Sequence, residues 1–303
     1  MKRTDKRKKR TGLKIFLSII VILLLVVGGT VFYIYNHAKN TVDKMHEPVE
    51  SIDTNLTKKK IKATEPINVL LLGIDSEEGQ KGRSDAIMIM RLLPDTDEMK
   101  IVSIPRDART EIIGKGFDDK INHAFAFGGP DMAVATVENF LNIDVDYYVT
   151  INMSGLVELV DQLGTITVDN DVEWSDKKYD FPLGRIELNG DQTKAFVRMR
   201  KQDVEGDFGR TKRHRKVIEG ILREGASVGS IPKFKGMIDI LGNNMSTNMD
   251  FKDMQTMFSG YYDTRNNITE YMVDGSGQMM DGIYYLIVPQ SEIDEAHNIL
   301  TTN

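Results

Sequence analysis

The sequence contains no cysteine. Disulfide bonds, thiolate metal sites and cysteine nucleophiles are therefore excluded, which suits an exported protein from an organism that does not depend on disulfides. A Walker A loop and a His-Glu-x-x-His motif are also absent. These absences remove P-loop nucleotide binding and zincin-type proteolysis from the candidate functions.

Positive charge is scarce beyond the first residues of the chain. The formal net charge is −6 over 303 residues, and residues 1–14 hold eight Lys or Arg side chains against one Asp, a net +7 that leaves about −13 for the rest. Affinity for nucleic acid comes mostly from neutralising phosphates over an extended surface. A body this acidic is therefore not expected to bind nucleic acid.

Residues 15–35 contain no charged side chain. A helix of this length spans roughly 30 Å, the thickness of the hydrocarbon layer of a bilayer. The alternative is a cleaved signal peptide, which needs a shorter apolar core and a small-x-small cleavage site, and no convincing site follows. We predict a transmembrane signal anchor, with residues 1–14 as a cytoplasmic tail and the body outside. The chain would then be a single-pass type II protein of the cell membrane.

Residues 36–65 are polar and mixed in charge, and Pro66 closes the stretch. We predict an extracytoplasmic spacer between the membrane and the body. Val42, Met45, Val49 and Ile52 recur at helical intervals, which indicates that part of the spacer is helical.

The predicted globular body, residues 66–303, alternates short apolar runs with segments of helical periodicity. The apolar runs predict strands at 68–75, 86–92, 99–104, 147–151, 166–168, 268–273 and 283–288. The periodic segments predict helices at 132–141, 154–163 (with Ser154 as N-cap), 191–199, 209–224, 232–241, 251–261 and 291–300. Strands interleaved with helices are typical of α/β proteins, and we predict a single α/β/α sandwich with a mixed β-sheet.

The stretch 198–216 concentrates positive charge within this acidic body. It holds eight Arg or Lys side chains against Asp203, Glu205 and Asp207. The planar donor fork of arginine matches phosphate oxygens, so the stretch predicts a site for a multiply charged anion. The alternative is a solvated basic helix face, which accounts for most charge runs.

Spacing within this stretch adds detail. Arg198 and Arg200 are two residues apart, so they face one ligand only if a helix ends near them. Arg210, Arg213 and His214 share a face of a following helix that begins at Asp207 or Gly209. The backbone N–H groups at the start of that helix favour an anion.

Charged residues also follow or precede three predicted strands. Asp75 ends the first strand, Arg83 and Asp85 stand before the second, and Arg106 follows the third. If these strands are neighbours, the four side chains converge at one edge of the sheet. Two carboxylates with arginines suit a magnesium-bound phosphate or pyrophosphate. The alternative is ordinary loop ion pairs.

Two other features carry less weight. His123 is interpreted as a loop or core histidine rather than a catalytic base. The sixteen methionines are interpreted mostly as core residues, with a flexible apolar groove for a lipid tail as the alternative for a minority.

Six motifs, in this order and behind a membrane anchor, resemble the LytR–CpsA–Psr family. The likeness is strong over roughly residues 66–225. The motifs are Asn68–Asp75, Arg83-Ser-Asp85-Ala-Ile-Met, Ser103-Ile-Pro-Arg106-Asp107, Lys120-Ile-Asn-His-Ala, Ala195-Phe-Val-Arg198-Met-Arg200 and Gly206-Asp207-Phe-Gly-Arg210-Thr-Lys-Arg213.

This resemblance implies a phosphotransferase that acts outside the cytoplasmic membrane. It would move an anionic glycopolymer, such as wall teichoic acid, from an undecaprenyl pyrophosphate carrier to peptidoglycan. A phosphodiester link would form in cell wall assembly, and undecaprenyl phosphate would leave. The alternatives are a polyprenyl pyrophosphate hydrolase, with water as the acceptor, and a non-enzymatic envelope regulator.

The resemblance also implies roles for individual residues. Asp75 and Asp85 would hold Mg²⁺, or Mn²⁺ in its place. Catalysis is assigned to Arg106, Arg200 and Asp207. The residues expected to bind the pyrophosphate are Arg83, Arg106, Lys120, Arg198, Arg200, Arg210 and His214.

One position departs from the family pattern, because His214 stands where the family usually has Gln. Either side chain can donate to a phosphate oxygen, but histidine can also titrate. The sequence does not choose a general base among Asp75, Asp85 and Asp207. The other cations of the basic stretch are expected to be solvated, namely Lys201, Lys212, Arg213, Arg215 and Lys216.

Overall fold

The computed structural model describes residues 29, 32–75, 82–199, 202–225 and 233–302. The predicted cytoplasmic tail and most of the predicted anchor, 15–35, lie outside these residues, as does Arg200. Within the described part of the chain, no helix combines the length and the apolar content needed to cross a bilayer. The anchor therefore stays a prediction from the sequence.

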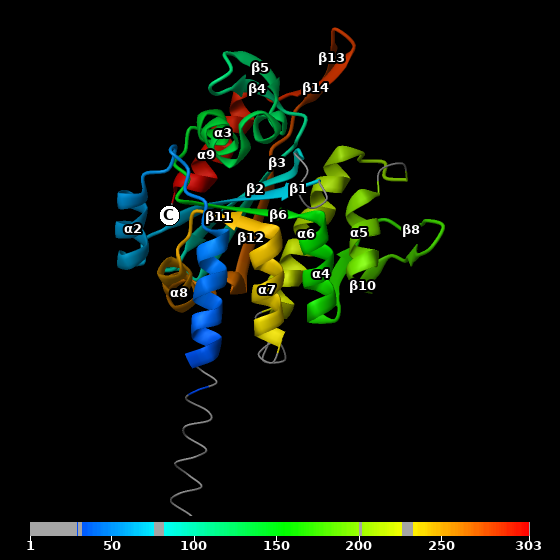
Figure 1. Ribbon diagram of the computed structural model, residues 1–303. Coiled ribbons are helices and arrows are strands. Elements are labelled where there is room, and N and C mark those ends of the chain that lie inside the picture. The colour runs from blue at the N-terminus through cyan, green and yellow to red at the C-terminus, as the bar shows by residue number, and fades with distance from the viewer. Residues whose placement is uncertain (1–28, 30–31, 76–81, 200–201, 226–232, 303) are drawn as a thin grey trace, which may run out of the picture.

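A six-stranded sheet forms the centre of the body, in the order β11-β6-β1-β2-β3-β12 (Figure 1). Antiparallel pairs join β1 to β2, β2 to β3 and β6 to β11, whereas β1–β6 and β3–β12 are parallel. The predicted mixed sheet is confirmed. Its strands are β1 (Ile67–Ile74), β2 (Ser84–Leu93), β3 (Glu98–Ile104), β6 (Tyr147–Asn152), β11 (Met245–Thr247) and β12 (Asn267–Met272).

Both faces of the sheet are apolar at its centre, because successive side chains of a strand point to opposite faces and β1 and β2 are hydrophobic at most positions. Leu70 and Leu72 belong to the cluster under α3 (His123–Leu141) and α9 (Gln290–Thr301). Val69 and Met88 belong to the cluster on the other face, which is shared with α2 (Thr54–Ala63) and α8 (Phe251–Gly260). Helices therefore cover both faces, as the sequence predicts (Figure 1).

A second group of helices extends this body beside β6. It consists of α4 (Met153–Leu163), α5 (Gly190–Arg198), α6 (Asp207–Gly225) and α7 (Phe234–Asn244). Their shared core includes Val160, Phe196 and Val217, which are fully or almost fully buried. The side chain of Asn152 accepts from the N–H of Gly155, so Asn152 rather than the predicted Ser154 caps α4.

Several strands lie outside the central sheet. The strand predicted at 166–168 is β7 (Ile166–Asn170), and it pairs only with β10 (Gly184–Leu188) among the described residues. The strand predicted at 283–288 is β14 (Ile283–Ile287), which forms a hairpin with β13 (Ser276–Met280) rather than closing the sheet. Two short hairpins are not predicted, namely β4 (Arg109–Ile112) with β5 (Phe117–Lys120), and β8 (Trp174–Ser175) with β9 (Asp180–Phe181).

One of two helix starts differs from its prediction. The helix predicted from Met132 begins nine residues earlier, at His123, and is kinked at Gly128 and Gly129. Gly129 has φ = 67°, a conformation that glycine adopts without steric cost, and Pro130 follows it. The α6 helix begins at Asp207, as one of the two predicted starts requires.

The segment 36–65 is folded against the body rather than standing apart from it as a spacer. Residues 32–45 are helical, and Val42 and Met45 are buried. The N–H of Glu47 donates to the Thr247 carbonyl of β11 at 2.8 Å, and the hydroxyl of Tyr148 donates to the Glu47 carbonyl at 2.6 Å. The apolar residues that indicate a partly helical spacer, among them Val42 and Met45, are thus the residues that pack against the body.

Candidate active site

Three neighbouring strands bring the predicted acidic and basic residues to one edge of the sheet. Asp75 directly follows β1, Asp85 is the second residue of β2, and Arg106 is two residues beyond β3. Pairing between β1 and β2 shifts at this edge, because Gly73 faces Ala86 whereas Ile74 faces Ser84. Asp85 is therefore the extra residue of a β-bulge, a device that re-aims side chains beside functional sites.

Asp85 lies between two arginines. Its Oδ2 accepts from Arg106 Nη1 at 2.7 Å and from Arg210 Nη2 at 3.0 Å, and its Oδ1 accepts from Asn122 Nδ2 at 3.2 Å. Burial alone would raise the pKa of Asp85, but the two guanidinium groups outweigh it and lower the pKa below its ordinary value. Asp85 is therefore an anion at neutral pH.

Arg106 also contacts Asp207 at the start of α6. Its Nη2 lies 3.0 Å from Asp207 Oδ1, so one guanidinium joins Asp85 to Asp207. Burial raises the pKa of the Asp207 carboxyl and the charge of Asp107 adds to this, although Arg106 acts in the opposite direction. Lys120 Nζ lies 2.6 Å from Asp107 Oδ1 on the same side of the site.

Arg198 is the last residue of α5, and Met199 after it is extended. The helix thus ends where the spacing of Arg198 and Arg200 requires it to end. Arg198 Nη2 donates to Asp75 Oδ1 at 2.8 Å, which brings the basic stretch to the end of β1. The carbonyl of Arg83 accepts from the N–H of Asp75 at 3.1 Å.

Part of this cluster lines a polar pocket. Asp75 and Asp85, at the ends of the neighbouring strands β1 and β2, line it together with the basic side chains of Arg83, Arg106 and Lys120. No group of three or more His, Cys, Asp or Glu side chains suited to a metal occurs among the described residues. Two carboxylates nevertheless suit Mg²⁺, which takes one or two of them and completes its shell with phosphate oxygens and water. The lining consists of Asp75, Gly82, Arg83, Asp85, Arg106, Asp107, Lys120, Asn122 and His123.

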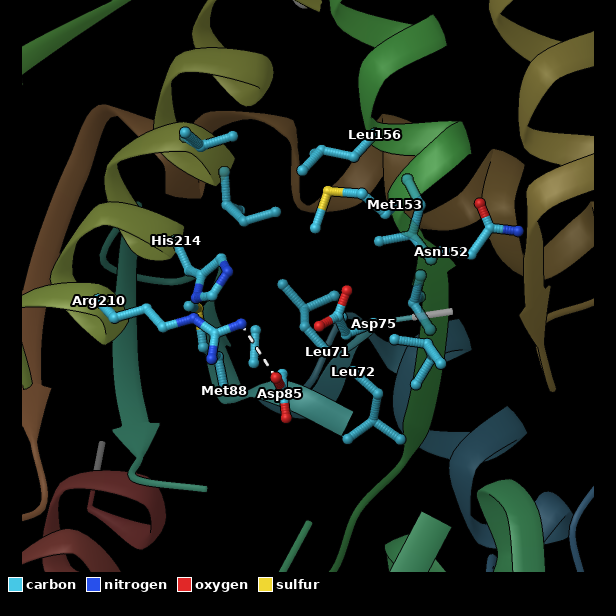
Figure 2. A pocket seen from close by; sticks show the side chains of 17 residues that line it. Leu71, Leu72, Asp75, Asp85, Met88, Asn152, Met153, Leu156, Arg210 and His214 are labelled. Carbon is cyan, nitrogen blue, oxygen red and sulfur yellow. Dashed lines mark hydrogen bonds and ion pairs between the residues drawn. The ribbon is translucent and has the colours of Figure 1, made fainter. Parts of the chain in front are cut away.

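An apolar pocket opens beside the polar pocket and shares Asp75 and Asp85 with it (Figure 2). It lies between the sheet and the helices α4 and α6 and has a cavity volume of about 60 Å³. Met88 and Met153 are among its lining residues. Their position agrees with the alternative interpretation, in which a minority of the methionines line an apolar groove. The other lining residues are Leu71, Leu72, Gly73, Ile74, Ala86, Val149, Ile151, Asn152, Leu156, Arg210, His214, Val217 and Ile218.

The sequence of the chain matches the model of the LytR_cpsA_psr family over residues 31–302. The chain belongs to this family. One relative is the polyisoprenyl-teichoic acid–peptidoglycan teichoic acid transferase TagU of Bacillus subtilis, which is 42% identical over 295 residues, 97% of this chain and 96% of the relative. The Oceanobacillus iheyensis protein of the same name is 40% identical over 312 residues, 99% of this chain and 97% of the relative. These relatives confirm the predicted enzyme class, a transferase.

Solved structures of LytR_cpsA_psr proteins share the fold. The crystal structure of B. subtilis TagU aligns with a TM-score of 0.65 at 42% identity, over 78% of this chain and 95% of that chain. A structure of TagT bound to LIIa-WTA aligns with the same TM-score at 31% identity, over 78% of this chain and 89% of that chain.

His214, the departure from the LytR_cpsA_psr pattern, lies in the wall of the apolar pocket. Burial and the neighbouring charge of Arg210 lower its pKa to about 3, so the imidazole is neutral. Its Nδ1 is buried and has no hydrogen-bond partner among the described residues. A neutral imidazole resembles the glutamine amide in that it offers a donor without a charge.

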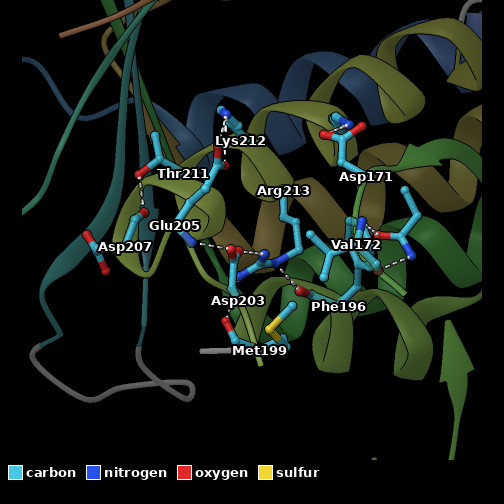
Figure 3. Close-up of polar contacts among 12 residues, drawn as sticks. Asp171, Val172, Phe196, Met199, Asp203, Glu205, Asp207, Thr211, Lys212 and Arg213 are labelled. Carbon is cyan, nitrogen blue, oxygen red and sulfur yellow. Dashed lines mark hydrogen bonds and ion pairs between the residues drawn. The ribbon is translucent and has the colours of Figure 1, made fainter. Parts of the chain in front are cut away.

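Two cations of the basic stretch that were expected to be solvated are buried instead. Arg213 forms an ion pair with Asp203, and donates to the carbonyls of Phe196 and Met199 at 3.0 and 2.7 Å (Figure 3). Arg215 forms an ion pair with Glu270. These two arginines hold elements together and do not face the polar pocket.

Sequence reasoning also missed Asn122 and Asp107 as members of the site. Asn122 and Asp107 belong to the same motifs as Lys120 and Arg106. Their closeness in sequence to these predicted ligands could therefore have identified them as site residues. Their contacts with Asp85 and with Lys120 depend on the β4–β5 hairpin, which was not predicted.

Proposed function

We propose that the chain transfers an anionic glycopolymer, such as wall teichoic acid, from an undecaprenyl pyrophosphate carrier to peptidoglycan. The observation that carries the proposal is the shared wall of the two pockets. Asp75 and Asp85 line both a polar pocket rich in cations and an apolar pocket. A ligand that reaches both pockets would join a diphosphate to an apolar chain, as a prenyl pyrophosphate does.

In the proposed reaction a peptidoglycan hydroxyl attacks the phosphorus that bears the glycopolymer. A new P–O bond forms, the bond from this phosphorus to the bridging oxygen breaks, and undecaprenyl phosphate leaves. Negative charge increases on the phosphate oxygens during attack, and preorganised arginines stabilise it. We assign this role to Arg106, Arg198 and Arg210, which already neutralise the carboxylates at this edge, together with Arg200, Arg83 and Lys120.

Asp207 is the carboxylate that we assign to the proton of the attacking hydroxyl. Asp85 accepts from three donors, and its lowered pKa makes it a weak base. Asp207 has a raised pKa and a more exposed side chain, so it is the stronger and more accessible base of the two. Asp75 and Asp85 would hold Mg²⁺ or Mn²⁺, which supplies charge neutralisation for the diphosphate when bound.

We place this reaction outside the cytoplasmic membrane, as in the predicted type II topology. The support is the uncharged run 15–35 behind a head with a net charge of +7. A lipid carrier anchored in the same membrane would then deliver its pyrophosphate to the body.

The test uses the full chain in detergent with lipid-linked glycopolymer, Mg²⁺ and peptidoglycan. Polymer linked covalently to peptidoglycan through a phosphodiester supports the transferase. Release of free polymer phosphate alone would support the polyprenyl pyrophosphate hydrolase. That enzyme would bind the pyrophosphate with the same residues as the transferase. Omission of the metal with a chelator tests the Mg²⁺ assignment in the same assay.

A further inference from the structure

A third pocket adjoins the polar pocket of the active site. It lies between the loop that leads into α6 and strand β14. We call it the Tyr284 pocket and define it by Asp107, Val204, Gly206, Asp207, Tyr284 and Leu286, which are among its lining residues. It shares Asp107 with the polar pocket and shares no lining residue with the apolar pocket.

The β13–β14 hairpin is fixed to the active-site loop, although it projects from the body at its tip (Figure 1). The N–H of Leu286 donates to the carbonyl of Asp107 at 2.9 Å, and Ala108 forms a β-bridge with Leu286. Side chains two residues apart on a strand share a face. Tyr284 and Leu286 accordingly both line the pocket.

The ring of Tyr284 is held in place while one side of it stays open. A Cβ atom at Gly277, across the hairpin, would lie 2.8 Å from the Cε2 and Oη atoms of Tyr284, so the ring lies directly over this glycine. Lys120 Nζ lies 6.0 Å from the ring centroid. Tyr284 nevertheless remains 44% exposed, and Val204 at the rim is 97% exposed.

Such a surface suits a sugar ring. A fixed aromatic ring offers a flat apolar face, and its hydroxyl supplies a polar contact at the edge. Asp107, Asp207 and Glu205 supply acceptors for sugar hydroxyls around the same pocket. Each of these carboxylates is paired with a cation, Asp107 with Lys120, Asp207 with Arg106 and Glu205 with Lys212, and each keeps lone pairs that can accept from a sugar hydroxyl.

The position of the pocket indicates whether it binds the donor or the acceptor. In an in-line displacement the nucleophile and the leaving group lie on opposite sides of the phosphorus. The leaving prenyl phosphate would extend into the apolar pocket past Asp85 and Arg210. Arg106 reaches Asp85 with Nη1 and Asp207 with Nη2, so the side of Asp207 is the side from which a hydroxyl approaches.

We propose that the Tyr284 pocket binds the acceptor glycan and presents its hydroxyl beside Asp207. This inference rests on the proposed transferase function. It adds Tyr284 as a residue that positions the acceptor and makes no contact with the donor.

The experiment compares full-length wild type with Tyr284→Ala and Tyr284→Phe, using lipid-linked glycopolymer as donor and an uncrosslinked peptidoglycan glycan oligomer as acceptor. For Tyr284→Ala we expect the KM for the oligomer to rise about tenfold, as for loss of an aromatic contact at a binding hot spot. We expect the KM for the donor, and its slow cleavage by water without acceptor, to stay within about twofold. Tyr284→Phe keeps the ring, so its KM should stay close to that of wild type.

Met279→Ala is the matched control, because Met279 pairs with Tyr284 across the hairpin and is 62% exposed but does not line the pocket. It should behave as wild type. A rise in the KM for the donor, with an unchanged KM for the acceptor, would overturn the proposal and assign the pocket to the donor polymer. Unchanged constants in Tyr284→Ala would also overturn it.

Calorimetric binding of the oligomer alone separates this proposal from the proposed function. If wild type binds the oligomer and Tyr284→Ala binds it about tenfold more weakly, the acceptor pocket stands even if no transfer product forms. Failure of transfer with intact binding would then count against the transferase function only. Equal binding by both proteins would count against the pocket.

Discussion

Arg213 and Asp203 form a buried ion pair that joins α6 to the loop after α5. The same guanidinium donates to two carbonyls at the end of α5, so it fixes the segment from which Arg198 reaches Asp75 (Figure 3). Removing one partner of a buried pair leaves the other charge uncompensated, which is more costly than losing an exposed pair.

Asp203→Ala is therefore expected to lower the free energy of unfolding by about 3–5 kcal/mol. The control is Lys212→Ala, which removes the exposed pair with Glu205 and should cost no more than about 1 kcal/mol. Urea unfolding monitored by circular dichroism measures both. Equal losses in the two variants would contradict the structural role of Asp203.

Gly209→Ala tests the close approach of α6 to the same carboxylate. A Cβ at Gly209 would overlap the Asp203 carboxylate, so the variant must displace it and should lose about 1–3 kcal/mol. Gly225→Ala in the same helix is the control, because its Cβ would meet only Met237 at 3.6 Å. That change should be neutral or slightly stabilising, since alanine favours a helix over glycine. Thermal melts of both variants measure the difference, and equal melting temperatures would contradict the close approach of α6 to Asp203.

Arg106→Ala is expected to reduce the rate of transfer by at least roughly 10²–10³-fold, because it removes donors aimed at the developing charge. The fold should persist, which the far-ultraviolet spectrum and the melting temperature report. Arg109→Ala is the control, since its exposed pair with Asp118 lies on the β4–β5 hairpin outside the polar pocket. Normal transfer by Arg106→Ala to peptidoglycan oligomers would refute the site assignment.

Arg200→Ala is expected to abolish transfer without unfolding the chain. This prediction comes from the sequence alone, since Arg200 lies outside the described residues. Single-turnover assays with the lipid-linked donor measure the effect, beside Lys212→Ala as a variant of the same basic stretch. Retention of more than a tenth of the wild-type rate would remove Arg200 from the catalytic residues.

His214→Gln tests the neutral imidazole. Its folded pKa of about 3 lies below the ordinary value of 6.5, so the unfolded state binds more protons between these pH values. Stability of the wild type should therefore fall as the pH drops below about 6.5, by up to about 1.4 kcal/mol per unit. The glutamine variant lacks this contribution. Melting temperatures from pH 7 to 4 compare them, and parallel curves would show that His214 is not buried in the neutral form.

The sequence predicts the central sheet well because β1, β2 and β3 are continuous apolar runs that read as buried strands. It also places Asp75, Asp85 and Arg106 at one edge, since each stands at the end of such a run. The end of α5 at Arg198 follows from the need for Arg198 and Arg200 to face one ligand.

The errors arise where a partner distant from the local pattern decides the outcome. Arg213 belongs to a charge run that looks solvated, and only the fold reveals that Asp203 is buried against it. Asn152 displaces Ser154 as the cap of α4 because its carboxamide oxygen meets the N–H of Gly155. The segment 36–65 is polar overall, yet its apolar positions Val42, Met45 and Ile52 are buried against the body.

The contact between Leu286 and Asp107 has a consequence for how the enzyme comes into being. The loop that carries Arg106 is flanked by a strand made some 180 residues later in synthesis. The active-site loop therefore gains its final support only when almost the entire chain has been made. A chain truncated before β14 would therefore lack the strand that supports the loop carrying Arg106.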